Sequence, residues 1–543
     1  MKKNIFYQIT TLGLAAGILL SSANLTAIPA QAAVAERPTY LRSVTYVSDA
    51  WVINFWNTES DHMEEELARI AADGFNSIIL VVPWREFQPQ TNPVSYSDYT
   101  FRKLERIMEA ANEQGLWVQL RVSYTWDYYE EEESALRFRE LLGDEEMRAA
   151  WLDYVKKIHQ TVSGYPNFYG GFLTWEDFWN YIESVPISGP GSASVSEADR
   201  IGYQDYLEKY YTLEQISEYY GKGRTFRDFD SIYIPERESP AYKLLYEYYD
   251  DFLKTLLFDA QRVFPNLSME VRLDVDPVNG KNGGKVGAHH YMTFPCGLSS
   301  YTSLMYSVAM GQENKGEKIS AAQALSMMES QLHLVRAYNG GKPIYIDQLL
   351  YMDATEQFSH NAQLYEEDRN VFLTSLPPVL RCYTNGYAVW SYLNYTHNPV
   401  YNCQFALGGR GWNTSRAETE QRNGSSQIKL QNGGSISQKI GHRIDGKTSH
   451  SNHVRFTADS DQPVTVSVTL GSITKEVQVQ GAGEYDLNFG KLNYEKVQFR
   501  ANGEVYLDNI QLYNFIQDGQ LHDIDGNELS CMDAMRELNG AMR

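Results

Sequence analysis

The sequence predicts an α/β chain, a (β/α)8 TIM barrel followed by a small all-β sandwich. Two observations carry the barrel: eight short apolar segments alternate with helical patterns between about residues 41 and 400, and no Gly-rich loop that would cradle a phosphate follows any of them. The missing loop favours the barrel over a doubly wound open sheet. After about Thr414, Gly, Ser, Asn and Gln become more frequent and segments of period two take over, which indicates the sandwich.

The N-terminus has the pattern of an export signal. Lys2 and Lys3 form a positive start, residues 9–20 are apolar, and Ala30-Gln31-Ala32 is a small-residue cleavage site. We therefore expect residues 1–32 to be a signal peptide and the mature chain to be secreted.

The barrel is expected over residues 40–414, with an insertion at 179–264 that is rich in Tyr and charge and helical in its second half. Gly74 and Gly115 each stand where a helix is expected to end, in the position after the C-cap that glycine favours. The expected strands are 43–54, 76–82, 116–122, 172–175, 268–273, 303–308, 343–346 and 386–390. The expected helices include 61–73, 99–114, 144–162, 321–338 and 371–382.

The sandwich is expected over residues 415–515. Alternating apolar residues mark its strands, and Asn432-Gly433 and Asn502-Gly503 are turn signals between them. The expected strands include 454–456, 464–470, 475–479 and 497–512. Residues 516–543 form a polar extension with a short amphipathic helix, to which the sequence assigns no role.

Composition narrows the range of partners. The 543 residues carry 69 Asp and Glu against 47 Lys and Arg, a net charge of −22, which argues against nucleic acid and against an anionic membrane surface. No apolar run after the N-terminus is long enough for a membrane span, so no membrane insertion is expected. The sequence does not indicate an oligomeric state.

Four cysteines are too few and too scattered for a disulfide framework, although Cys382 and Cys403 are candidates for one bridge. No metal-ligand spacing is present among Cys and His, so neither a metal nor a cofactor is predicted.

Aromatic residues make up 13% of the chain, with 39 Tyr and 10 Trp, and many follow expected strands. Aromatic rings hold sugars by stacking on their apolar faces, or they cover a large core. We therefore expect a poly- or oligosaccharide as the partner of this chain.

The stretch Gly171-Phe172-Leu173-Thr174-Trp175-Glu176-Asp177 reads as a buried strand that ends in an indole and two acids. Side chains at the carboxyl end of a parallel strand face the cleft where chemistry occurs. Partial desolvation beside an indole raises the pKa of a carboxylic acid toward that of a general acid. The alternative is that Glu176 caps a helix or pairs with an Arg.

Three segments resemble the clan of retaining (β/α)8 glycoside hydrolases that contains cellulases, mannanases and β-galactosidases. Residues 74–89 resemble its second strand and following loop, 342–346 its seventh strand, and 386–391 its eighth strand with a Trp that floors the sugar subsite. The insertion is similar to that of β-galactosidase-like members, and residues 505–512 resemble the last strand of a jelly-roll carbohydrate-binding module. The resemblance implies cleavage of a β-linked glycan by two carboxyl groups.

In this clan the acid/base ends strand four and the nucleophile ends strand seven. Carried over, the acid/base is Glu176, although Trp175 stands where the clan usually has Asn, and Asp177 competes if the strand ends one residue later. The clan's nucleophilic Glu aligns with Gln348, or with Asp347 if the register slips by one. An amide cannot attack as a carboxylate does, so the strand-seven pair is the departure from the pattern.

Three interpretations of this departure remain open. In the first, Asp347 is the catalytic carboxylate. In the second, another acid such as Asp353 or Asp274 replaces it. In the third, Gln348 marks an inactive barrel, and the chain is an exported protein that binds glycan without turnover. The sequence does not decide the sugar, the linkage, or endo against exo cleavage. It also leaves the mechanism open, because a deeper Asp347 with room for water would make the reaction inverting.

Several further residues are candidates for substrate contact, each with a structural alternative. Arg121 would hydrogen-bond the nucleophile or form an ion pair within the barrel, and Tyr306 would donate to the nucleophile or pack in the core. Loop residues His289 and His290 would touch substrate or be merely exposed. The full set of expected binding residues is Trp84, Arg121, Trp126, Asp177, Tyr306, Gln348 and Trp390.

Overall fold

The structure is a computed structural model that describes residues 36–543 with short gaps. The gaps are 51, 60–61, 125–130, 175–177, 180–181, 183–184, 186, 222, 274–275, 280–284, 289–291, 309–316, 353–362, 397, 441–450, 514–515, 518–520 and 524. The expected signal peptide lies outside the described residues.

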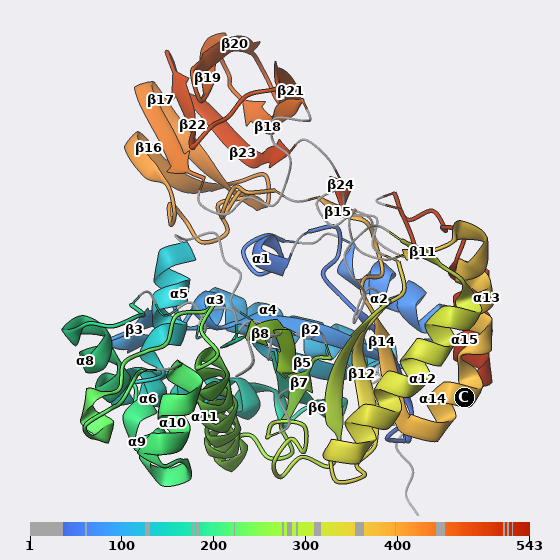
Figure 1. Ribbon diagram of the computed structural model, residues 1–543. Coiled ribbons are helices and arrows are strands. Elements are labelled where there is room, and N and C mark those ends of the chain that lie inside the picture. Colours follow the sequence, from blue (N-terminus) through green and yellow to red (C-terminus); the bar gives the residue numbers. More distant parts are fainter. Residues whose placement is uncertain are drawn as a thin grey trace, which may run out of the picture. The chain divides into compact units, whose positions relative to one another are not determined.

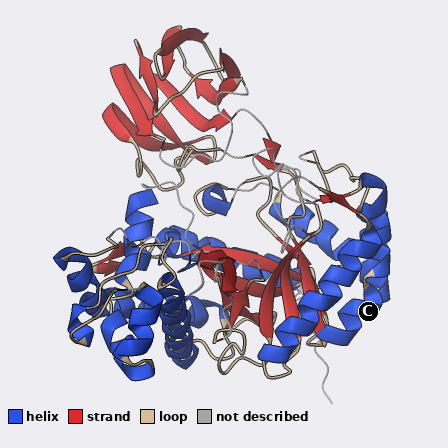
Figure 2. Ribbon diagram, in the orientation of Figure 1, coloured by secondary structure: helices blue, strands red, loops and turns tan. Residues whose placement is uncertain are grey.

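Eight parallel strands close into a barrel in the order β1-β14-β12-β10-β7-β6-β5-β2, which confirms the predicted fold class. Helices surround this sheet on its outer side (Figures 1 and 2). The strands are β1 (Leu41–Thr45), β2 (Ser77–Pro83), β5 (Trp117–Tyr124), β6 (Phe168–Leu173), β7 (Ser268–Val271), β10 (Thr302–Ser307), β12 (Ile344–Leu350) and β14 (Thr384–Val389).

The helices of the barrel form where an amphipathic pattern follows a capping residue. Ser97 caps α4 by accepting a hydrogen bond from the Thr100 amide, and Ser320 forms a capping box with Gln323 at the start of α12. The main helices are α2 (Met63–Ala72), α4 (Asp98–Glu113), α6 (Glu145–Val162), α11 (Tyr242–Val263), α12 (Ala321–Tyr338), α13 (Arg369–Ser375) and α14 (Pro377–Tyr383).

Three expected elements differ in the structure. The first strand ends at Thr45, and Val52–Phe55 forms the short helix α1. The helix expected at 371–382 is two helices, because Pro377 has no amide hydrogen to continue α13 and begins α14 instead. The insertion is helical in both halves: it contains α8 (Ser192–Arg200), α9 (Tyr203–Tyr210), α10 (Leu213–Tyr220), the 3-10 turn η1 (Phe229–Ser231) and α11.

Short elements complete this part of the chain. They are α3 (Trp84–Phe87), α5 (Glu131–Glu140), β3 (Gln90–Thr91), β4 (Val94–Ser95), β8 (Asp276–Asn279), β9 (Lys285–Ala288), β11 (Lys318–Ile319), β13 (Gln363–Leu364), η3 (Glu366–Asp368), β15 (Tyr395–Thr396) and β24 (Ile516–Gln517).

The C-terminal part is the expected antiparallel β-sandwich, and its longest strand belongs to both layers. Within β17 (Ser425–Lys439), residues 428–430 pair with β23 and residues 435–439 pair with β22. The change of layer falls at Gly433, whose φ of 75° is readily adopted by glycine, so Asn432-Gly433 is a bend within a strand and not the turn that we predicted. The other strands are β16 (Asn413–Arg422), β18 (Asn452–Asp459), β19 (Val464–Leu470), β20 (Ile473–Val479), β21 (Gly483–Gly490), β22 (Lys496–Ala501) and β23 (Val505–Tyr513).

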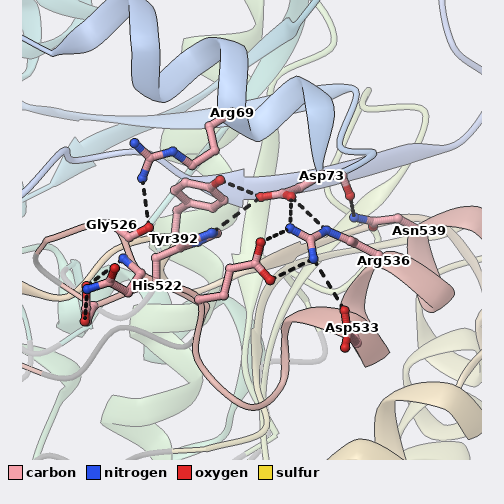
Figure 3. A network of polar contacts seen from close by, with 11 residues as sticks. Arg69, Asp73, Tyr392, His522, Gly526, Asp533, Arg536 and Asn539 are labelled. Atoms are coloured by element: carbon pink, nitrogen blue, oxygen red, sulfur yellow. Dashed lines mark hydrogen bonds and ion pairs between the residues drawn. The ribbon is translucent and has the colours of Figure 1, made fainter.

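The C-terminal extension ends in helix α15 (Met532–Ala541), which packs against α13. Its polar residues converge on Asp73, the buried C-cap of α2 (Figure 3). Arg536 donates to Oδ1 of Asp73 from Nε at 3.0 Å and Nη2 at 2.8 Å, and Tyr392 donates to Oδ2 at 2.6 Å. The Asn539 side chain donates to the Asp73 carbonyl at 2.9 Å. The extension is therefore tied to the end of α2.

All four cysteines are free, so the bridge between Cys382 and Cys403 is not formed. Within the described part of the chain, no helix combines the length and the apolar composition that crossing a membrane requires.

We predict that Asp73→Asn destabilises the fold by about 2 kcal/mol, because it removes the negative charge that pairs with Arg536. The Asp73 side chain is 4% exposed and that of Arg536 is 36% exposed. Urea unfolding followed by circular dichroism measures the change. Asp533→Asn is the matched control, because Asp533 also contacts Arg536 at 3.4 Å but is 98% exposed. Equal effects of the two substitutions would contradict the importance of the Asp73 contact.

Burial of Asp250 on α11 predicts a pH dependence of stability. Burial raises the pKa of this carboxyl to about 7, although it accepts a hydrogen bond from the Met292 amide at 2.8 Å. The folded chain thus holds this proton at a pH where the unfolded chain releases it, so the Asp250 contribution to stability falls as the pH rises from about 4 to 7. Asp250→Asn is expected to flatten this part of the pH profile of the unfolding free energy. An unchanged profile would contradict the assignment.

Candidate active site

The inside of the barrel is filled by side chains from alternate positions of its strands. Leu41, Ile79, Phe172, Tyr345 and Ala388 come from five different strands and pack together with Tyr301, which directly precedes β10. Only the lumen brings these strands within reach of one another. The Tyr301 hydroxyl donates to the Gly171 carbonyl at 3.0 Å, which satisfies a polar group in this apolar layer.

Strand β5 shows how alternation selects the residues of the lumen. Gln119 accepts a hydrogen bond from the Tyr301 hydroxyl at 3.3 Å, and Arg121, two residues later, also reaches inward. Leu120 and Val122 point the other way, into the core shared with the surrounding helices. Arg121 therefore lies one step nearer the carboxyl end of the strand than Gln119, toward the end where TIM barrels carry their sites.

Arg121 connects three strands across the lumen. Its Nη2 lies 3.1 Å from Oε2 of Glu270 on β7, and both side chains are at least 95% buried. Its Nη1 donates to Oε1 of Gln348 on β12 at 3.3 Å. Of the two expected roles for Arg121, the structure thus shows the ion pair within the barrel, with a hydrogen bond to the strand-seven amide in addition.

A β-bulge in β12 explains how two neighbouring residues both reach the lumen. Leu304 pairs with Ile346 and Met305 pairs with Gln348, so Asp347 is the extra residue between them. Gln348 is held by Arg121, whereas Asp347 is 3% exposed and stands two residues after Tyr345, which belongs to the lumen layer. Burial is the main cause that raises the pKa of Tyr301 and of Tyr345, and the charge of Asp347 adds to both shifts. The two neighbours are thus not alternatives, because both face inward.

Trp84 and Tyr306 lie in the core. The Trp84 ring is 1% exposed, packs edge-on against Phe138, and donates from its indole nitrogen to Gln88 at 2.7 Å. It has no exposed face on which a sugar could stack. Tyr306 is 2% exposed and packs among the residues between the barrel and its helices, on the side of β10 opposite Met305. Burial raises the pKa of its hydroxyl.

Trp390, directly after β14, is partly exposed and keeps the position expected for a stacking residue. Glu176, Asp177 and Trp126 lie outside the described residues, as do the alternatives Asp274 and Asp353 and the two loop histidines, His289 and His290. Thr174, two residues before Glu176, is fully buried.

Glu270, the acid that holds Arg121, is not among the site residues expected from the sequence. A signal for it existed: Glu270 stands between Met269 and Val271 in a strand that is otherwise apolar or small, and a charge in such a strand requires a partner. Among the described residues, no group of three or more His, Cys, Asp or Glu is arranged to hold a metal ion.

We predict that Arg121→Met lowers the free energy of unfolding by roughly 3–5 kcal/mol, because it leaves the Glu270 charge buried without its cation. Denaturant unfolding at pH 7 measures this loss. The control is Arg106→Met, which breaks an exposed pair with Glu59 and is expected to cost less than about 1 kcal/mol. A similar small cost for both variants would contradict the role of the lumen pair.

No family model and no curated protein match this chain. Solved structures that resemble it include a GH5_18 protein from Streptomyces cattleya in complex with GlcNAc, at 16% identity and a TM-score of 0.41, covering 66% of this chain and 71% of that one. They also include an exo-β-1,4-mannosidase from Opitutaceae bacterium strain TAV5, at 12% identity and a TM-score of 0.39, covering 66% and 53%. A β-galactosidase from the psychrophilic Marinomonas ef1 has 11% identity and a TM-score of 0.44, covering 65% and 54%. Likenesses at this level do not assign a function, which must come from the residues of the lumen.

Proposed function

We propose that this chain is a secreted glycoside hydrolase that cleaves a β-linked poly- or oligosaccharide by a retaining, two-carboxylate mechanism. The observation that carries the proposal is the position of Asp347. It is a buried carboxylate on the lumen side of the seventh strand of a closed (β/α)8 barrel, beside an amide that Arg121 holds. Trp390 at the end of the eighth strand is the proposed stacking surface for a sugar ring.

The proposed chemistry uses Glu176 and Asp347 in turn. Glu176, three residues after the end of the fourth strand, donates its proton to the glycosidic oxygen as the bond to the leaving sugar breaks. Asp347 attacks the anomeric carbon from the opposite face and forms a glycosyl ester. Glu176 then takes a proton from a water molecule as that water attacks the anomeric carbon and breaks the ester bond to Asp347. Both carboxyl groups return to their starting states. This course requires the two carboxyl groups to be about 5–5.5 Å apart.

Gln348 supports a second candidate, an exported glycan-binding protein without turnover. In the resemblance to retaining glycosidases, Gln348 takes the place of the nucleophilic Glu, and its amide carries no charge with which to attack. In this alternative the barrel holds sugar against Trp390, and Asp347 only accepts hydrogen bonds from it.

Release of reducing ends from β-glucan, β-mannan and β-galactan oligosaccharides tests the enzyme. We expect release by the wild type, and a loss of about 10³-fold or more in kcat for both Glu176→Gln and Asp347→Asn, because each step of the reaction needs both carboxyls. Trp84→Phe, a conservative change in the core, is the control and is expected to retain kcat.

Zero release by the wild type and both variants, with glycan binding retained, would contradict turnover and support the binding protein. Full activity of Asp347→Asn with loss only in Glu176→Gln would reject Asp347 as the nucleophile.

A further inference from the structure

We infer that Glu270 is a positioning residue of the lumen site: it holds Arg121 so that Arg121 fixes the strand-seven amide of Gln348. The kinetic part of this inference rests on the proposed function, whereas its structural part does not. Glu270 itself is not proposed to touch the reacting atoms.

The side chain that holds Gln348 of β12 in place comes from another strand of the barrel. Arg121 comes from β5, and its fork spans from Glu270 on β7 to Gln348 on β12, at 3.1 Å and 3.3 Å. Glu270 is fully buried and pairs in register with Ser303 of β10, which in turn pairs with Tyr345 of β12. A charge in this position fixes a long, flexible arginine side chain that would otherwise have several rotamers available.

The contact also decides which end of the Gln348 amide faces Arg121. A guanidinium has only N–H donors, so the carbonyl oxygen of the amide accepts from it. The amide nitrogen then points away from Arg121 with two donors. Beside it stands Asp347, brought to the lumen by the bulge. The fixed amide is thus a donor group next to the proposed nucleophile.

Charge balance explains why a neutral residue stands at position 348. The charge of Glu270 already matches the guanidinium of Arg121 directly, with Nη2 and Oε2 3.1 Å apart. A Glu at position 348 would place a second carboxylate against Arg121, whose charge Glu270 already matches, and like charges repel in a medium of low dielectric constant. The carboxylate that pairs with Arg121 therefore comes from β7, and the residue on β12 is an amide.

The effect of Gln348→Glu on stability is expected to depend on whether Glu270 is present. In the wild-type background the substitution adds a repelling carboxylate and is expected to lower the unfolding temperature at pH 7. In the Glu270→Gln background it supplies the acid that Arg121 has lost, so it is expected to raise the unfolding temperature.

The kinetic readout separates positioning from mere stability. Released from Glu270, Arg121 no longer holds the Gln348 amide in place beside Asp347, the proposed nucleophile. Glu270→Gln is therefore expected to lower kcat about 10- to 100-fold, a size typical of misplaced active-site groups, with KM changed less than about threefold. Glu270→Gln/Gln348→Glu is expected to regain part of that loss, because Arg121 is held again.

The experiment measures the unfolding temperatures of the wild type, Glu270→Gln, Gln348→Glu and the double variant at pH 7, and kcat and KM on the oligosaccharide that the wild type cleaves fastest. Asp73→Asn is the control, since it disturbs a buried Asp–Arg contact outside the lumen and is expected to lower the unfolding temperature without changing kcat. Additive temperature shifts in the double variant, or an unchanged kcat in Glu270→Gln, would overturn the inference. If the wild type hydrolyses nothing, the proposed function fails, while the sign reversal in unfolding temperature still decides the role of Glu270.

Discussion

The guanidinium of Arg121 inside the barrel is the constraint on which the candidate site depends. A charge that is removed from water costs several kcal/mol unless an opposite charge and hydrogen-bond acceptors surround it. The eight-stranded closure leaves no free sheet edge to supply such partners, so they come from lumen-facing side chains. Glu270 supplies the charge and Gln348 supplies an acceptor. One guanidinium thereby couples three strands that are far apart in the sequence.

The β12 bulge places two different side chains, a carboxylate and an amide, on the lumen side of one strand. In a regular strand, adjacent residues face opposite sides, and either Asp347 or Gln348 would lie against the helices. With one extra residue, the amide contacts Arg121 and the carboxylate stays beside it in the lumen. The layer of Leu41, Phe172, Tyr345 and their neighbours fills the lumen next to these groups, so the site is backed by packed side chains.

The order of strands and helices could be predicted because it depends on local pattern. Residues 321–338, for example, carry a capping signal and helical periodicity, and α12 has these bounds. The fate of Val52–Phe55 could not be predicted in this way, since a short apolar run is compatible with a strand or with a turn of helix. Asn432-Gly433 is a dipeptide typical of hairpin turns, but here it lies inside strand β17. Residues on either side of it pair with different strands, β23 and β22.

The site was harder to predict than the fold, because its contacts join residues 149 and 227 positions apart along the chain, as Arg121 is to Glu270 and Gln348. Sequence indicated that Arg121 and the strand-seven pair mattered, but not that Glu270 pairs with Arg121 while Arg121 contacts Gln348. It also could not separate Trp84 from Trp390, since both follow apolar strands and only packing shows that the first ring is enclosed.

The central claim is that Asp347 is the carboxylate that attacks the sugar. Incubation with an activated 2-deoxy-2-fluoro β-glycoside slows the second step of a retaining reaction, so the covalent glycosyl ester accumulates. Mass spectrometry of the digested protein then locates the label. The account predicts a single label on the peptide that contains Asp347. A label on the Glu270 peptide or on Asp353, or no label while the enzyme still turns over ordinary substrate, would contradict it.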